Sequence, residues 1–125
     1  MIQTPTYSEL MHLVDLTCLK DVVTPKDIAE LALQGSLYQV AALCVWPQHL
    51  NWIPLDCKLQ KATVVNFPDG QQSTIDIQLD IDKIVHHHPG TEIDYVFPYK
   101  NYWAGEKHLA LNQCHTIGQH CAEHG

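Results

Sequence analysis

Four short apolar runs recur along the chain, separated by turn residues and polar stretches. The runs cover residues 12–17, 39–46, 61–67 and 92–97. A proline follows each of the last three runs. Runs that are apolar almost throughout, without strict alternation, are typical of strands buried on both faces of a parallel sheet. The pattern therefore predicts four parallel β-strands.

The segment between the first two runs carries the signals of a helix over residues 24–35. Thr24 suits the N-cap position, and Pro25 suits the first helical position. Asp27 stands three residues after the cap, and the apolar positions that follow have helical spacing. Gly35 is expected to end this helix, because glycine readily adopts the left-handed conformation of a C-terminal cap.

Residues 74–88 are ambiguous from sequence alone. Isoleucine and leucine alternate there with polar residues, which is a strand pattern. Ile77, Ile81 and Ile84 also form a stripe with helical spacing. We predict a helix, because the segment is too long for one strand and lies between two better strand candidates.

Further helical segments are predicted around residues 7–11, from Pro47 to Ile53, and over residues 106–123. The last helix is expected to turn Leu109, Ala110, Cys114, Ile117 and Cys121 inward. Strands and helices then alternate through a single domain, residues 1–125, in which residues 1–11 form a leading helical segment.

This alternation predicts an α/β fold with right-handed crossovers between parallel strands. A doubly wound sheet and a (β/α) barrel both fit the order. Neither GxGxxG nor GxxxxGK[ST] occurs in the sequence, so these phosphate-binding loops of nucleotide folds are absent. In both architectures, active residues cluster at the carboxyl ends of the strands.

Composition and charge narrow the classes of function. The chain has 125 residues, of which 46% are hydrophobic and 17% charged, a balance that argues against disorder. Seven lysines and no arginine face fourteen acidic residues, and the net charge of −7 argues against nucleic-acid binding. No apolar run approaches the roughly 20 residues that a bilayer requires, and no signal peptide is visible, so no membrane association is expected. The five cysteines form no CxxC motif, which favours reduced thiols in the cytoplasm.

Polar side chains occur at the expected strand ends, where the chemistry of a parallel α/β fold is found. They are Asp15 and Thr17, then Cys44, then Asn66, then Asp94. An apolar strand rarely carries a carboxylate, because burying an unpaired charge is costly. These carboxylates can still be structural, capping a loop or pairing with a lysine. Cys44 by itself is more often a small buried apolar residue.

The histidines offer weaker candidates for a site. The three consecutive histidines at 86–88 point in different directions on a helix, and a favourable charge at the helix end explains them best. His120 and His124 are four residues apart with Cys121 between them, a set that could bind zinc. A frayed, solvated terminal helix is the interpretation we favour there, so no metal site is predicted.

Four strings taken together resemble successive strand ends of deoxyribose-phosphate aldolase. The strings are DLT at residues 15–17, AALCVWP at 41–47, ATVVNFPDG at 62–70 and EIDYVFPYKNYWAG at 92–105. Their order and spacing are similar through the whole chain, which resembles the N-terminal half of that family.

The resemblance implies a class I aldolase on a TIM barrel, acting through a lysine Schiff base with no metal and no cofactor. Such an enzyme cleaves 2-deoxy-D-ribose 5-phosphate to D-glyceraldehyde 3-phosphate and acetaldehyde. By resemblance, Asp94 corresponds to the acidic proton-relay residue, and Asp15 to the aspartate near the substrate hydroxyls. Cys44 corresponds to a cysteine at the pocket edge, and Thr17 and Asn66 are expected to contact substrate.

The departure from this family is one of length. A TIM barrel needs about 250 residues, and the sequence covers about four β/α units, a half-barrel. The family's Schiff-base lysine and phosphate-binding loops belong to later strands. Lys20 and Lys100 are the only lysines that follow predicted strand ends, and neither is expected to form the Schiff base. The chain alone is therefore predicted to be inactive.

Two functions from different classes remain open. The first is a deoxyribose-phosphate aldolase polypeptide acting on a small phosphorylated sugar or aldehyde. The second is a non-catalytic half-barrel remnant, or a small-ligand binding module, that folds by oligomerising. Because the end strands of a half-barrel lack neighbours, we expect a homo-oligomer or a complex with a complementary C-terminal half.

Overall fold

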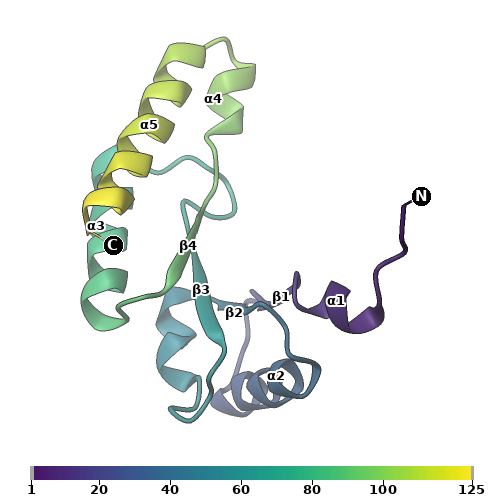
Figure 1. Ribbon diagram of the computed structural model, residues 1–125. Coiled ribbons are helices and arrows are strands. Elements are labelled where there is room, and N and C mark those ends of the chain that lie inside the picture. Colours follow the sequence, from purple (N-terminus) through teal and green to yellow (C-terminus); the bar gives the residue numbers. More distant parts are fainter. Residues whose placement is uncertain (1, 125) are drawn as a thin grey trace. The chain divides into compact units, whose positions relative to one another are not determined.

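The computed structural model describes residues 2–124, with strands and helices in the predicted alternation (Figure 1). In chain order the elements are α1 (Tyr7–Met11), β1 (Asp15–Cys18), α2 (Pro25–Tyr38), β2 (Ala42–Val45), the 3₁₀ helix η1 (Pro47–Trp52), β3 (Gln60–Val65), α3 (Thr74–His87), β4 (Glu92–Tyr95), α4 (Tyr99–Trp103) and α5 (Lys107–His124). The strands form one parallel sheet in the order β1-β2-β3-β4. The predicted α/β class, with sequential parallel strands, is confirmed.

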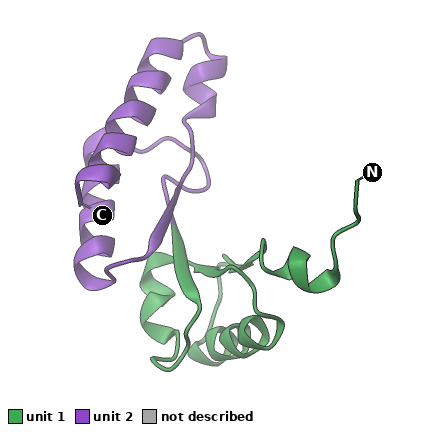
Figure 2. Ribbon diagram, in the orientation of Figure 1, with its two compact units in different colours: residues 1–63 green, residues 64–125 purple. Residues whose placement is uncertain are grey.

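The chain divides into two compact units, residues 1–63 and residues 64–125 (Figure 2). The boundary falls within β3, so the first unit holds β1, β2 and most of β3, with α1, α2 and η1. The second unit holds the end of β3 together with α3, β4, α4 and α5. The single-domain assignment stays a prediction.

In the first unit, β2 lies between β1 and β3, and all four of its residues are buried. This central position explains why the strand is apolar throughout, since neither face meets water. The one polar side chain in the buried part of β3, Thr63, donates its hydroxyl hydrogen to the carbonyl oxygen of Val45 at 2.7 Å. Its burial therefore leaves no hydroxyl donor unpaired.

Helix α2 begins as the sequence predicts but ends later. The Thr24 hydroxyl accepts from the backbone N–H of Asp27, and the Asp27 carboxylate accepts from the backbone N–H of Thr24. The backbone and hydroxyl hydrogen bonds from Thr24 lower the pKa of the Asp27 carboxyl. The predicted stop at Gly35 is wrong, because the helix continues to Tyr38 and the left-handed residue is Gln39, with φ of 54°.

Gly35 does not cap the end of α2 but allows the helix to pack closely against its neighbours. A β-carbon at this buried position would lie 2.6 Å from Cδ2 of Leu43 and 3.0 Å from Cδ1 of Leu59. Glycine therefore allows α2 to approach the sheet at the level of β2.

In the second unit, α3 settles the ambiguity of residues 74–88 in favour of a helix. Ile77, Ile81 and Ile84 are buried along one face, as a helical stripe requires. Ile75 and Leu79, which a strand would have placed on the same face as Ile77, are 68% and 52% exposed. Helix α3 packs against α5.

Helix α5 buries less than the sequence predicts. Ala110 and Ile117 are buried and Cys121 is half-buried, but Leu109 and Cys114 are exposed, so their inward placement is wrong. Within its own unit α5 packs against α3 and α4. Contacts on one side bury a narrow stripe of a helix, and apolar residues beside that stripe stay exposed. The short helix α4 was not predicted.

Candidate functional site

Thr17 and Cys44 are brought together by the register of the first unit. The two residues are partners in the parallel pairing of β1 with β2, and Cys44 is in turn paired with Ala62 of β3. Paired residues and residues two apart share one face of a sheet, so Asp15 lies on the same face as Thr17. Asp15 and Thr17 are exposed, whereas Cys44 is buried.

The structure places Asp15 differently from the prediction within its strand. The strand was expected over residues 12–17, but β1 runs from Asp15 to Cys18, so Asp15 opens it. Thr17 lies nearer the carboxyl end, and its hydroxyl donates to the carbonyl oxygen of Asp15 at 2.9 Å. Thr17 is therefore the better placed of the two for chemistry at the strand end.

Asn66 ties the loop after β3 to the end of β4. Its side-chain amide donates to the carbonyl oxygen of Val96 at 2.8 Å, and its side-chain oxygen accepts from the backbone N–H of Gln72 at 2.8 Å. Its own backbone N–H donates to Oε1 of Gln72 at 3.1 Å. The residue is buried and has a left-handed φ of 58°, which asparagine tolerates better than most residues. These contacts give Asn66 a positioning role, and its contact with substrate stays a prediction.

Asp94 lies on the exposed side of β4. Glu92 and Asp94 are exposed, while Ile93 and Tyr95 are half-buried, as the alternation of a strand requires. The Asp94 carboxylate thus stands on the face of β4 that is open to solvent within this unit. Its role in proton transfer stays a prediction.

A second polar network, which the sequence did not reveal, lies on the other side of β4. The Tyr95 hydroxyl donates to Oε1 of Gln113 at 2.6 Å. The Gln113 amide donates to the carbonyl oxygen of Gln72 at 3.2 Å and to Oγ1 of Thr74 at 3.3 Å. Burial, with a smaller contribution from Cys114, raises the pKa of Tyr95 to about 12. The network joins β4, α5 and the start of α3.

In each unit, the described residues line a cavity near the carboxyl end of a strand. In the first unit, a cavity of about 410 Å³ is lined by Thr17, Lys20, Asp27 and Glu30, among others. In the second unit, a cavity of about 230 Å³ is lined in part by Gly70, Gln72, Pro98 and Gln113. Thr17 is the predicted site residue that lines one of them.

The lysines do not stand in the surroundings that Schiff-base chemistry requires. Lys20 and Lys100, which follow strand ends, are exposed. Lys61 is half-buried, but it is the register partner of Leu43, whose side chain points toward α2. A nucleophilic lysine needs desolvation or a neighbouring cation to lower its pKa. Exposure of Lys20 and Lys100 offers no desolvation.

The histidines differ in how they are held. At the end of α3, Nδ1 of His87 lies 2.9 Å from the carbonyl oxygen of Lys83, a contact within its own helix. In residues 2–124, one group of possible metal ligands converges, namely Asp82, His120 and His124. Helix α5 extends to His124, and the fraying expected at its end stays a prediction.

Among residues 2–124, no helix is both long and apolar enough to cross a membrane.

No family model matches the chain. In sequence, the chain is similar to the deoxyribose-phosphate aldolase of Agrobacterium fabrum, with 29% identity over 118 residues. The match covers 90% of this chain and 45% of that aldolase, so the chain spans about half the length of this curated relative. The predicted resemblance to deoxyribose-phosphate aldolase is confirmed.

Two solved structures share the fold. A Coccidioides immitis protein described as a deoxyribose-phosphate aldolase has a TM-score of 0.84 at 17% identity, over 97% of this chain and 49% of that one. The tetrameric deoxyribose phosphate aldolase of Aeropyrum pernix has a TM-score of 0.68 at 18% identity, over 86% and 50%. The (β/α)-barrel type of fold is confirmed, and this chain matches about half of each structure.

Proposed function

We propose that this chain supplies half of a deoxyribose-phosphate aldolase site. The reaction is the reversible cleavage of 2-deoxy-D-ribose 5-phosphate to D-glyceraldehyde 3-phosphate and acetaldehyde, through a Schiff base on a lysine that this chain does not contain. The similarity to the Agrobacterium fabrum aldolase over 90% of the chain carries the proposal. The polar residues at the strand ends of a parallel α/β fold support it.

Each of the site residues expected from the sequence has a chemical role in this proposal. Asp94 relays protons through a water, because forming and breaking the enamine requires a carboxylate that exchanges protons at neutral pH. Asp15 accepts hydrogen bonds from the substrate hydroxyls. Thr17 and Cys44, neighbours in the β1–β2 register, line the substrate pocket, and Asn66 holds its loop against the segment after β4.

A chimaera tests the catalytic role of this half. The part of the Agrobacterium fabrum aldolase that the match covers is replaced by this chain, and aldehyde release from 2-deoxy-D-ribose 5-phosphate is measured. We expect turnover, and we expect Asp94→Asn to lower it by about 10²–10⁴-fold, the usual contribution of a positioned acid–base group. Glu92→Gln, an exposed carboxylate on the same strand, is the matched control and should leave the rate unchanged. A folded chimaera that traps substrate with borohydride but is insensitive to Asp94→Asn would contradict the role of Asp94.

The 125-residue chain itself is tested by borohydride trapping with substrate, read by intact mass. We expect no covalent adduct and no measurable turnover, because imine formation is the step that stabilises the carbanion. Turnover that is lost in Lys20→Met or Lys100→Met would overturn this expectation and assign the Schiff base to this chain. Binding of substrate with no adduct, in a chimaera that is folded yet inactive, would favour the binding-module alternative.

A further inference from the structure

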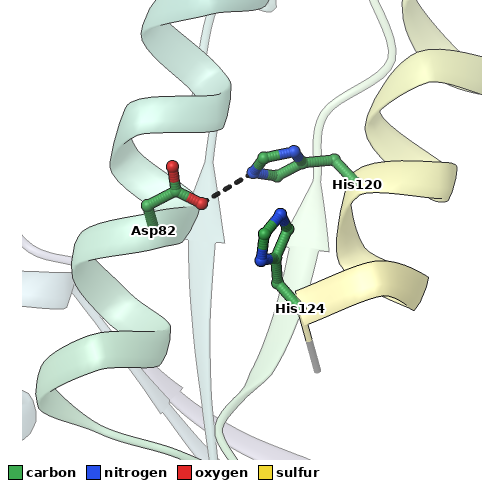
Figure 3. Close-up of side chains that lie close together, drawn as sticks. All are labelled: Asp82, His120 and His124. Atoms are coloured by element: carbon green, nitrogen blue, oxygen red, sulfur yellow. Dashed lines mark hydrogen bonds and ion pairs between the residues drawn. The ribbon is translucent and has the colours of Figure 1, made fainter.

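Three side chains from two helices of the second unit converge at one point (Figure 3). His120 and His124 lie one turn apart on α5, and their ring centroids are 4.4 Å apart. Asp82 comes from α3, and its Oδ1 lies 2.7 Å from Nε2 of His120. Each of the three offers one nitrogen or oxygen atom, and these atoms all lie within 4.8 Å of one another.

The backbone beneath this cluster is held by packing. Ile81, next to Asp82 on α3, and Ile117, one turn before His120 on α5, are both essentially inaccessible to solvent. The two helices pack against each other. The backbone that carries the three side chains is therefore already ordered, so a ligand does not have to supply the free energy of ordering it.

The nitrogen and oxygen atoms of Asp82, His120 and His124 are of the kind that bind Zn²⁺. Two imidazole nitrogens and one carboxylate oxygen are common ligands of Zn²⁺, which leaves a fourth tetrahedral position for water. Bond lengths of about 2.0–2.2 Å place tetrahedral ligands roughly 3.3–3.6 Å apart. The present separations, 2.7 Å for the closest contact and no more than 4.8 Å for any pair, bracket that range. Rotation of exposed side chains is sufficient to reach it, since His124 and Asp82 are both exposed.

We propose that Asp82, His120 and His124 form a Zn²⁺ site that bridges α3 and α5. The ion takes the place of the hydrogen bond between Asp82 and His120, and His124 is its third ligand from the chain. An ion bound by residues of both helices holds the end of α5 against α3. A ligand that binds the folded state and not the unfolded state raises the free energy of unfolding. Mg²⁺ and Ca²⁺, which prefer oxygen ligands, should bind poorly to this set.

A competing reading is an ordinary ion pair between Asp82 and His120, with His124 solvated nearby. His124→Gln separates the two readings, because it leaves the Asp82–His120 contact and the packing of both helices in place. If the site is only an ion pair, this variant behaves as the wild type. If the site binds Zn²⁺, the variant loses a ligand.

The experiment is a Zn²⁺ titration of the full 125-residue chain, stripped of metal by chelation, against a chromophoric zinc indicator. Wild type should bind one Zn²⁺ more tightly than its remaining cysteines and histidines do. We expect His124→Gln, His120→Gln and Asp82→Asn each to weaken this binding by at least about tenfold. His115→Gln removes an exposed histidine of the same helix, and Cys121→Ser removes the thiol beside the site, so both are matched controls that should bind as wild type.

Thermal unfolding gives a second readout that does not depend on the indicator. Saturating ZnCl₂ should raise the Tm of the wild type, and the rise should be lost in His124→Gln, while MgCl₂ should have no effect on either. Equal zinc binding by wild type and His124→Gln would overturn the proposal, as would binding that depends on Cys121 and not on Asp82.

Discussion

Asn66 joins two backbone segments of the second unit with one side chain, namely the loop after β3 and the end of β4. Its amide and its carbonyl oxygen are both used, on Val96 and on Gln72, and its backbone adopts a left-handed φ. Residues of this kind are constrained by hydrogen bonding and by backbone conformation at once. The two constraints are separable by substitution.

Asn66→Ala should destabilise the chain by about 1–3 kcal/mol, because it leaves the Gln72 N–H and the Val96 carbonyl without their partner. Alanine also lacks asparagine's tolerance of the left-handed backbone, which adds a further penalty of about 1 kcal/mol. Asn66→Gly loses the same hydrogen bonds but relieves the backbone, so it should be less damaging than alanine. Urea denaturation measures both, and an alanine variant as stable as wild type would show that the loop repairs its own hydrogen bonds.

The ionisation of Tyr95 predicts how the stability of the folded chain changes in alkaline solution. Its pKa is raised to about 12 by burial, while an unfolded tyrosine ionises near 10. The folded state keeps the proton that the unfolded state loses, so stability is full below pH 10 and falls as the pH rises from about 10 to about 12. The difference in absorbance at 295 nm between wild type and Tyr95→Phe reports the ionisation of Tyr95, and it should change near pH 12. The phenylalanine variant should lose less stability than wild type between pH 10 and pH 12. A difference spectrum that titrates near pH 10 would contradict the burial of this hydroxyl.

At the scale of elements, two helical glycines have opposite surroundings. A β-carbon at Gly35 of α2 would press on Leu43, Leu59 and Val40, the nearest atom at 2.6 Å. A β-carbon at Gly118 of α5 would meet nothing within 4 Å. The same residue type therefore serves close packing in one helix, while in the other no neighbour requires it.

Gly118→Ala should stabilise the chain by about 0.5–1 kcal/mol, since alanine is the better helix former. Gly35→Ala gains the same propensity but overpacks the contact of α2 with the sheet, which costs about 1–3 kcal/mol. We expect the second variant to be less stable than the first by that amount in thermal or urea unfolding. Equal effects of the two substitutions would mean that Leu43 and Leu59 move aside without cost.

At the scale of the whole molecule, the sheet has two end strands. The strands β1 and β4 each have one neighbour in the order β1-β2-β3-β4. Several large apolar side chains are also exposed, including Val22, Leu37 and Trp103. Unpaired strand edges and exposed apolar side chains favour association with another chain.

We expect the pure chain to sediment at micromolar concentration as a species larger than the monomer. Association should weaken on dilution if it pairs edges of separate chains, because it is then a bimolecular equilibrium. A compact, stable monomer that binds no hydrophobic dye would contradict this expectation. Co-purification with a complementary chain would support it and identify the partner.

The sequence by itself determined the class of fold and the order of its elements. Apolar runs separated by capped helices depend on local periodicity and on backbone preferences, which are written in neighbouring residues. The isoleucines of α3 illustrate this, since their helical spacing predicted the face that the structure buries. Thr17 near the carboxyl end of β1 and Asn66 directly after β3 lie where the sequence placed them, whereas Asp15 opens β1, because the order of elements does not fix the residue at which a strand begins.

Only the tertiary structure decided which distant residues meet. The register that pairs Thr17 with Cys44, the loop that Asn66 ties to Val96, and the packing that makes Gly35 a contact residue all depend on contacts between segments far apart in the chain. His120 and His124 show the same limit. Their spacing placed them on one face of a helix, but the carboxylate that completes the cluster comes from α3, 38 residues before His120. Periodicity along a chain says which face a side chain takes, whereas the neighbour of that face is set by packing between elements.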